Sequence, residues 1–311
     1  MTPPFSVRDL DPASPTDAEG VTAVLRAAVP PHLTTPEAVR WSVGHAPAAQ
    51  RFRLLVAQDE EGLVLGRAQV GLAHESPTRG AAFCNVYVHP EHLRRGVGSA
   101  LVREAEKHLV EVGGRSVYSW VLEGPGNRAF AASFGYTPSR SAHFLRLDLT
   151  AGLPEAGEVP VGVELVPASA FDGDPRPLFL LDAECTKDEP SDIGIELDDY
   201  ADWLEYTWNH PLLDRELTTV VLVDGVPAAF SAAHSDRVSR YSSAMTGTLR
   251  AYRGRGLASL AKATALRRAR AAGLTEAFTG NDMENGPMLA INRRLGYEIV
   301  ATEVRHVHEL G

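Results

Sequence analysis

The sequence predicts an α/β protein that consists of two tandem domains, each with a central mixed β-sheet flanked by helices. Three observations support this prediction. The chain has 311 residues, and at roughly 150 residues per domain this length suggests two domains. Both halves contain short β-rich segments, then an arginine-glycine turn, and then a long helical segment. These landmarks recur in the same order and at nearly constant spacing, which indicates an internal duplication.

The duplication is clearest at the two turns. Gly96 lies in the first turn, and Gly256 lies in the second turn 160 residues later. A Gly-Tyr pair follows each turn, at residues 135–136 and 296–297, and these pairs are 161 residues apart. A constant offset across successive landmarks is typical of a duplicated domain.

The boundary between the two domains is expected at residues 151–160. This segment is rich in Gly, Pro and Ala, as linkers are. The N-terminal domain then covers residues 1–150, and the C-terminal domain covers residues 161–311. A strand predicted at residues 143–149 would close the N-terminal domain. Either half is long enough to bury its own hydrophobic core.

The residue patterns predict the same elements in both halves. Strands are indicated by β-rich runs at residues 53–58, 64–73, 82–88 and 116–122, and at residues 218–223, 228–233 and 242–249. Apolar residues at helical spacing predict helices over residues 99–112 and 257–272, and each helix ends at a glycine. Each turn therefore lies between a strand and a helix.

The composition argues against several classes of protein. The net charge of −10 argues against a general affinity for nucleic acid. Cys84 and Cys185 fall one in each half, too few for a disulfide framework and consistent with a reducing cytoplasm. The first residues lack the basic and apolar regions of a signal peptide, and no apolar run approaches the roughly 18 residues of a membrane span. We therefore expect a cytoplasmic protein that binds neither nucleic acid nor membranes.

A turn of this kind between a strand and a helix is suited to binding an anion. Glycines allow the backbone to approach a ligand closely, and the first N–H groups of a helix have no partner within it. The helix dipole adds about half a positive charge at this end, and arginine contributes charge and paired donors. The two turns therefore predict phosphate or pyrophosphate sites. For a single turn, a plain loop with solvent-facing arginines explains the same residues.

The turns resemble the signature of the GNAT acyltransferases, which is Arg/Gln-x-x-Gly-x-Gly/Ala at the start of the central helix. Residues 253–258 match this signature in full. In the first half Gly96 and Gly98 match, but Leu93 stands where Arg or Gln is usual, and two arginines follow it. The resemblance covers both halves. It implies a transferase that moves an acetyl or other acyl group from acyl-CoA to an amine, with acetyl-CoA as the cosubstrate. We expect no metal.

The resemblance also implies which residues bind the CoA moiety: the strand end before each turn, the turn itself, and asparagines or a methionine after the next strand. In the first half these are Val86, Tyr87, Val88, Arg94, Arg95, Gly96, Val97, Gly98, Ser99 and Asn127. In the second half they are Thr246, Gly247, Thr248, Arg253, Gly254, Arg255, Gly256, Leu257, Ala258, Ser259, Asn281, Asn285, Met288 and Asn292.

The second half is the better candidate for the catalytic domain, because its turn matches the family pattern more fully. An acidic stretch with interleaved aromatic residues covers residues 182–205 and precedes the hairpin of this half. The resemblance places the acceptor wall there, and a cationic amine would suit it. A solvated acidic helix face explains the same residues equally well. Glu196 and Asp198 are the candidates for a general base or an acceptor contact.

Neither half has the usual tyrosine that protonates the leaving thiolate in the family. Family members often use a tyrosine four residues before the Gly-aromatic pair, but Ala131 and Asn292 occupy these positions. Either another residue serves, or the thiolate leaves without a dedicated acid, which its low pKa permits. The first half is then a second active domain, a CoA-binding but inactive partner, or a degenerate scaffold. The Leu93 departure favours the latter two.

The sequence therefore predicts an acetyl-CoA-dependent N-acetyltransferase that acts on a primary amine of a small, cationic metabolite or antibiotic-like acceptor. One alternative is acetylation of a protein or peptide amine. Another is a non-catalytic acyl-CoA-binding regulatory module, which the two missing tyrosines support. We expect a monomer or a homodimer.

Overall fold

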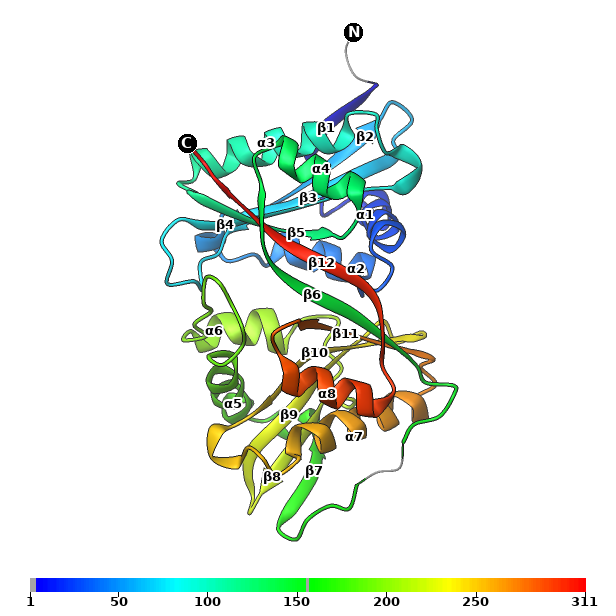
Figure 1. The fold of residues 1–311 in the computed structure, drawn as a ribbon, viewed down its shortest axis with the longest axis vertical. Coiled ribbons are helices and arrows are strands. Elements are labelled where there is room, and N and C mark those ends of the chain that lie inside the picture. Colours follow the sequence, from blue (N-terminus) through cyan, green and yellow to red (C-terminus); the bar gives the residue numbers. More distant parts are fainter. Residues whose placement is uncertain (1–3, 155–156) are drawn as a thin grey trace. The chain divides into compact units, whose positions relative to one another are not determined.

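The computed structural model describes residues 4–154 and 157–311 and contains two compact units (Figure 1). Unit 1 comprises Met1–Ala142 and Ala301–Gly311, and unit 2 comprises His143–Val300. This division differs from the expected boundary at residues 151–160, of which residues 155–156 lie outside the described part of the chain. The reason is an exchange of strands: the last strand of the chain completes the sheet of unit 1, whereas residues 143–148 belong to unit 2.

Unit 1 is a mixed sheet with helices on both faces. Its strand order is β1-β2-β3-β4-β5-β12-β6, and the pairings from β1 to β12 are antiparallel except for the parallel pair β4–β5. The elements are β1 (Phe5–Asp9), α1 (Pro15–Ala28), α2 (Pro36–Gly44), η1 (Ala48–Gln50), β2 (Arg53–Asp59), β3 (Val64–Leu72), β4 (Ala81–Val88), η2 (Pro90–His92), α3 (Val97–Glu111), β5 (Ser116–Leu122), α4 (Pro125–Ser133), and parts of β6 (Thr137–Asp148) and β12 (Glu298–Glu309).

Alternation along the strands produces two hydrophobic cores in unit 1. Leu55 and Ala57 of β2 pack with α3, whereas Leu54 and Val56 pack with α1 and α2 on the opposite face. Successive side chains of a strand point to opposite faces, so one short strand serves both cores. The sheet therefore separates the α3 face, which carries the turn, from the face covered by α1 and α2.

Unit 2 repeats this arrangement. The order of its strands is β6-β11-β10-β9-β8-β7, with β10 and β11 as the parallel pair. The elements are β7 (Val163–Pro167), η3 (Ala168–Phe171), α5 (Arg176–Thr186), α6 (Tyr200–Trp203), η4 (Leu204–Trp208), β8 (Thr219–Val223), β9 (Val226–Ser235), β10 (Arg240–Thr248), η5 (Arg250–Tyr252), α7 (Leu257–Ala271), β11 (Glu276–Asp282) and α8 (Gly286–Leu295). Helix α7 packs against β9 and β10, as α3 packs against β3 and β4 in unit 1.

The parallel pair in each unit separates before the strands end. In unit 1 the pairing of β4 with β5 covers only Ala81–Phe83, and the Asn85 side chain then accepts a hydrogen bond from the Trp120 N–H at 2.9 Å. In unit 2 the pairing of β10 with β11 covers Arg240–Ser243. Each gap opens beside the helix that follows the turn.

The predicted α/β fold with two similar domains is confirmed. The helices predicted at residues 99–112 and 257–272 are α3 and α7, and the predicted strands are present. The strand predicted at residues 143–149 is the second half of the long strand β6. Within the described ranges, no helix is both long and apolar enough to cross a membrane.

Candidate functional site

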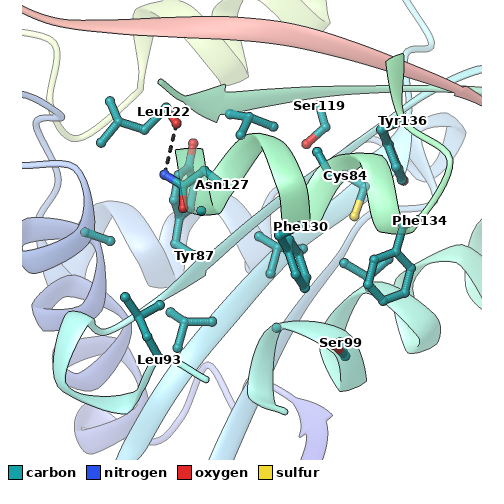
Figure 2. Close-up of a pocket in the computed structure, with 18 of the residues that line it drawn as sticks. Cys84, Tyr87, Leu93, Ser99, Ser119, Leu122, Asn127, Phe130, Phe134 and Tyr136 are labelled. Atoms are coloured by element: carbon teal, nitrogen blue, oxygen red, sulfur yellow. Dashed lines mark hydrogen bonds between the residues drawn. The ribbon is translucent and has the colours of Figure 1, made fainter. Parts of the chain in front are cut away.

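A cavity of about 560 Å³ lies in unit 1 at the N-terminus of α3, where β4 and β5 separate (Figure 2). Most of the residues that the sequence predicted for CoA binding in this half line it. They are Val86, Tyr87, Val88, Arg94, Gly96, Gly98, Ser99 and Asn127. Arg95 and Val97 do not line it: the Arg95 guanidinium donates to the Glu91 carbonyl at 3.1 Å, and Val97 is buried in the core.

The turn in unit 1 has the backbone geometry of an anion site. Gly96 adopts the left-handed conformation at φ 86° immediately before α3. A Cβ placed on Gly96 would meet no described atom within 4 Å. Among the described residues, no side chain caps the first turn of α3 or of α7, whereas Ser14 and Thr35 cap α1 and α2. The open N–H groups of α3 are therefore available to a bound anion.

The remainder of the cavity is largely apolar. Figure 2 shows Phe130 and Phe134 projecting from α4 on the side of α3. The Asn127 side-chain amide donates to the Leu122 carbonyl at 2.9 Å, which fixes the end of β5 (Figure 2). Burial raises the pKa of the Cys84 thiol to about 12, so this cysteine is not a nucleophile at neutral pH. The cavity therefore combines an anion-binding end with an apolar wall.

In unit 2 two arginines at the turn are paired with a carboxylate of their own unit. Arg250 and Arg253 both ion-pair with Asp188, which follows α5, and Arg253 also donates to the Thr248 carbonyl at 3.1 Å. Hydrogen bonds from the two arginines hold the pKa of Asp188 well below its ordinary value. Gly256 has the same left-handed conformation as Gly96. The arginine that the sequence assigned to a pyrophosphate is thus already paired with a carboxylate.

Helix α5 packs closely on the strand that leads into this turn. A Cβ placed on Gly247 would lie 2.6 Å from the Cys185 Cβ, so only glycine allows this approach. Cys185 belongs to a buried cluster with Phe230 of β9. At the neighbouring position, the Thr246 hydroxyl lies 3.0 Å from the Ser231 hydroxyl. In unit 2 the predicted residues 246–248 therefore contact their own unit.

The predicted asparagines of unit 2 make internal contacts as well. Asn285 caps α8, because its side chain accepts a hydrogen bond from the Met288 N–H at 3.2 Å. Asn292 is fully buried and donates to the Asn281 side chain. Its own side-chain oxygen has no hydrogen-bond partner among the described residues. The predicted asparagines that precede Gly296 and Tyr297 therefore hold β11 and α8 together within unit 2.

A buried lysine lies in the same region of unit 2. Lys262 of α7 is 1% exposed, donates to the Thr279 hydroxyl at 3.3 Å, and lies 5.3 Å from the Tyr297 ring centre. Burial lowers the pKa of Lys262 to about 7. At the spacing of 160–161 residues, four polar residues of unit 2 correspond to cavity-lining residues of unit 1: Lys262 to Val102, Thr279 to Ser119, Asn281 to Val121, and Asn292 to Ala131.

The candidate catalytic residues Glu196 and Asp198 lie on an irregular segment between α5 and α6, and both are exposed. Neither lines the unit 1 cavity. The aromatic residues near them form a hydrophobic cluster: Trp203 and Trp208 are buried, and the Trp203 indole donates to Asp182 at 2.8 Å. Burial raises the pKa of Asp182. The acidic stretch is therefore divided between an exposed segment and the core of unit 2.

Sequence reasoning missed Asp188 as a partner of the second turn, because its contacts with Arg250 and Arg253 span more than 60 residues. It also missed Phe130 and Phe134 of the apolar cavity lining, which match no motif. Among the described residues, no group of three or more His, Cys, Asp or Glu side chains could hold a metal ion.

Comparisons with known proteins agree with this architecture. The chain matches the model of the acetyltransferase (GNAT) family over residues 24–136 and 181–297, two segments that contain both turns. A mycothiol acetyltransferase of Clavibacter michiganensis subsp. michiganensis is 29% identical over 272 residues, which is 85% of this chain and 86% of that protein. A mycothiol acetyltransferase of Mycobacterium ulcerans is 34% identical over 122 residues, 38% of this chain and 35% of that protein.

Solved structures share the fold over nearly the whole chain. A tandem GNAT protein from the clavulanic acid biosynthesis pathway superposes with a TM-score of 0.74 at 21% identity, covering 99% of both chains. A GCN5-related N-acetyltransferase from Sphaerobacter thermophilus superposes with a TM-score of 0.69 at 20% identity, covering 99% of this chain and 96% of that one.

Proposed function

The chain belongs to the acetyltransferase (GNAT) family, and from that premise we propose that it is an acetyl-CoA-dependent N-acetyltransferase whose acceptor is the primary amine of a small molecule. One observation carries the proposal: the cavity of unit 1 joins an uncapped glycine turn to an apolar channel. The sequence predicted CoA-binding residues in both halves and favoured the second half for catalysis, whereas this proposal places both the cosubstrate and catalysis in unit 1.

The cavity suits the two ends of acetyl-CoA. The turn at Gly96 offers backbone N–H groups and the positive end of the α3 dipole to a pyrophosphate. Arg94 lines the cavity beside it and supplies a charged donor, which compensates for Leu93. Val88 and Phe130 then provide an apolar path for an aliphatic arm.

The interior of the cavity suits an acyl transfer that uses few protein groups. Ala131 lines the cavity at the position where relatives often carry a tyrosine. Tyr136 also lines it, but burial raises the pKa of its phenol far above the ordinary value, which makes it a poor acid. A thiolate is a good leaving group because its pKa is low, and it needs no dedicated acid.

A titration with acetyl-CoA followed by a turnover assay tests the proposal. Calorimetry is expected to show binding of acetyl-CoA, and thiol release is expected with at least one small amine. The acceptor panel includes the unacetylated form of mycothiol, because the relatives are named for mycothiol, and a peptide with a free amine. Absence of heat with acetyl-CoA would contradict the proposal. Binding without turnover on any amine would favour a regulatory acyl-CoA-binding module, and turnover on the peptide alone would favour the peptide acetyltransferase.

A matched pair of variants identifies the site. Gly96 and Gly113 flank α3, have φ values of 86° and 87°, and have no described atom within 4 Å of an added Cβ. Alanine therefore imposes similar backbone strain at both positions. Gly96→Ala is expected to weaken acetyl-CoA binding at least tenfold, whereas Gly113→Ala keeps it. Equal affinities in the two variants would place the site elsewhere. We also expect the protein to be a monomer or a homodimer.

A further inference from the structure

We propose that Glu303, on the C-terminal strand β12, is the general base of the unit 1 site and accepts the proton of the acceptor ammonium group. This inference rests on the proposed acetyltransferase function. Sequence motifs do not indicate this residue, because at least 167 positions along the chain separate it from every residue that lines the cavity. The exchange of strands between the units brings it there.

The strand register places Glu303 at the margin of the cavity. Strand β12 pairs antiparallel with β5, so that Glu303 lies opposite Leu122 and Arg305 lies opposite Trp120. Residues directly opposite each other in an antiparallel pair share a face of the sheet and lie close together. Leu122 and Trp120 both line the cavity. Glu303 therefore lies beside the cavity, on the face of these two residues.

A second neighbour places Glu303 on the same side. Burial raises the pKa of the Tyr87 phenol to about 12; the charge of Arg67 opposes this shift and the charge of Glu303 adds to it. Tyr87 lines the cavity from β4, whereas Leu122 lines it from β5. Glu303 is thus close to cavity residues from both strands that form the gap.

This side of the sheet is the one that an acceptor would approach. Val86 and Val121 line the cavity on the α3 face, which carries the turn. Tyr87 packs with the core under α1 and α2 on the opposite face, and Ala28 and Val29 at the end of α1 line the cavity there. A ligand anchored at the turn must extend through the gap between β4 and β5 to meet a second substrate. Glu303 lies on the side where the two would meet.

The environment of Glu303 suits a base at neutral pH. Burial raises the pKa of its carboxyl to about 7, near the value at which a general base works best. Among the described residues, no side chain hydrogen-bonds or ion-pairs with this carboxyl. Charged or titratable groups on the surrounding strands include Arg305 on β12, Arg140 and His143 on β6, Arg67 on β3, Tyr87 on β4, Tyr118 on β5, and Glu123 after β5. Arg305 stacks on Tyr118 and Trp120, and Arg67 stacks on Tyr87.

The proposed step balances without a further reactant. The Glu303 carboxylate takes one proton from the R–NH3+ group of the acceptor, and the nitrogen lone pair then attacks the carbonyl carbon of the thioester. The C–N bond forms as the C–S bond breaks, and the nitrogen loses a second proton. The departing sulfur takes up this proton, and Glu303 releases the first to solvent. The products are an amide, the CoA thiol and one proton.

The substitution Glu303→Gln tests the proposal, with Glu309→Gln as the matched control. Glu309 lies on the same strand but is exposed, and its cross-strand partner Ser116 does not line the cavity, whereas Leu122, the partner of Glu303, does. The wild-type kcat/KM is expected to rise with pH through an apparent pKa of about 7, because the base must be unprotonated. In Glu303→Gln, kcat/KM is expected to fall about 10²- to 10⁴-fold and this limb of the profile to disappear. The affinity of Glu303→Gln for acetyl-CoA is expected to stay within about twofold of the wild-type value, a change much smaller than the expected fall in kcat/KM.

A stability measurement provides a readout that needs no ligand. A carboxyl whose folded pKa is raised from 4.5 to about 7 binds more protons in the folded state, so stability falls as pH rises across this window. Glu303→Gln is therefore expected to raise the Tm at pH 8 and to leave it nearly unchanged at pH 4. Glu309→Gln is expected to show no such pH dependence.

The outcomes separate this proposal from the proposed function. If the wild type turns over and Glu303→Gln keeps its rate and pH profile, the role of Glu303 is refuted while the acetyltransferase function stands. If the wild type neither binds acetyl-CoA nor acetylates any amine, both are refuted. Loss of turnover in Glu303→Gln together with loss of acetyl-CoA binding would also overturn the proposal, because a base for the amine is not needed to hold the cosubstrate.

Discussion

The gap between the two parallel strands is built in opposite ways in the two units. In unit 1 it opens into a cavity lined by Val102, Val121 and Ala131. In unit 2 the corresponding residues are Lys262, Asn281 and Asn292. Lys262 and Asn292 are buried and Asn281 is half-buried, and each makes a hydrogen bond within unit 2. A duplicated framework has thus kept its strands, turn and helix while the chemistry of the gap has diverged. A full match to the turn signature does not by itself predict an open site.

The residues around each turn show the same contrast. Tyr87 of β4 lines the cavity in unit 1, whereas the corresponding position in unit 2 is Gly247, on which Cys185 of α5 packs. Asp188 then reaches both Arg250 and Arg253. The complete signature in unit 2 is paired internally, and the incomplete signature in unit 1 borders the cavity.

The largest expected effect comes from giving unit 1 the buried lysine of unit 2. Val102→Lys would place a long charged side chain in the apolar wall of the cavity, one helical turn from Glu106. We expect loss of acetyl-CoA binding, because the new side chain occupies the cavity, together with an overpacking cost of about 1–3 kcal/mol in stability. Thermal unfolding and calorimetry measure the two effects. Val110→Lys is the control, because Val110 is exposed on the same helix. Unchanged acetyl-CoA affinity in Val102→Lys would show that this wall does not border the bound ligand.

The reverse substitution, Lys262→Met, is expected to stabilise unit 2 in a pH-dependent manner. The folded pKa of Lys262 is lowered from 10.5 to about 7, so the unfolded state binds more protons between these values and wild-type stability rises with pH across this window. At roughly 1.4 kcal/mol per pKa unit, the gain from Lys262→Met is a few kcal/mol below pH 7 and shrinks toward pH 10. Unfolding in denaturant at pH 6 and pH 9.5 measures it. A gain in stability that does not change with pH would refute the lowered pKa of Lys262.

Gly247→Ala tests the close packing of α5 on β10. The new methyl group would overlap Cys185, and overpacking of this kind costs about 1–3 kcal/mol. Gly280→Ala is the control, because an added Cβ at Gly280 on β11 has no described atom within 4 Å. Denaturant unfolding of both variants is the measurement. Equal stabilities of Gly247→Ala and Gly280→Ala would show that α5 shifts away from β10 at no cost.

The smallest expected effect comes from Asp188→Ala, which frees Arg250 and Arg253. We expect a second, weaker binding event for pyrophosphate in calorimetry, with little change in stability because the ion pairs are partly exposed. Asp198→Ala removes another exposed carboxylate before α6 and serves as the control. If Asp188→Ala shows no second binding event for pyrophosphate, the ion pairs of Asp188 do not prevent anion binding at the turn of unit 2.

The sequence was sufficient to predict the fold and the position of both turns, because these depend on local patterns. Gly96 and Gly256 each begin a helix in the left-handed conformation, as a strand-turn-helix with glycine requires. The exchange of β6 and β12 was not predictable, since the pairing of β12 with β5 joins residues more than 180 positions apart along the chain. The pairing of Asp188 with the second turn and the position of Glu303 beside Leu122 depend on tertiary contacts between distant residues.

The central claim is that the gap of unit 1, rather than that of unit 2, receives the acyl-CoA. Calorimetric titration of Gly96→Ala and Gly256→Ala with acetyl-CoA tests it most directly, because both glycines have positive φ and open space around an added Cβ. We expect the wild type and Gly256→Ala to bind one acetyl-CoA per chain with similar affinity, and Gly96→Ala to bind at least tenfold more weakly. Loss of binding in Gly256→Ala, with Gly96→Ala unchanged, would contradict the claim.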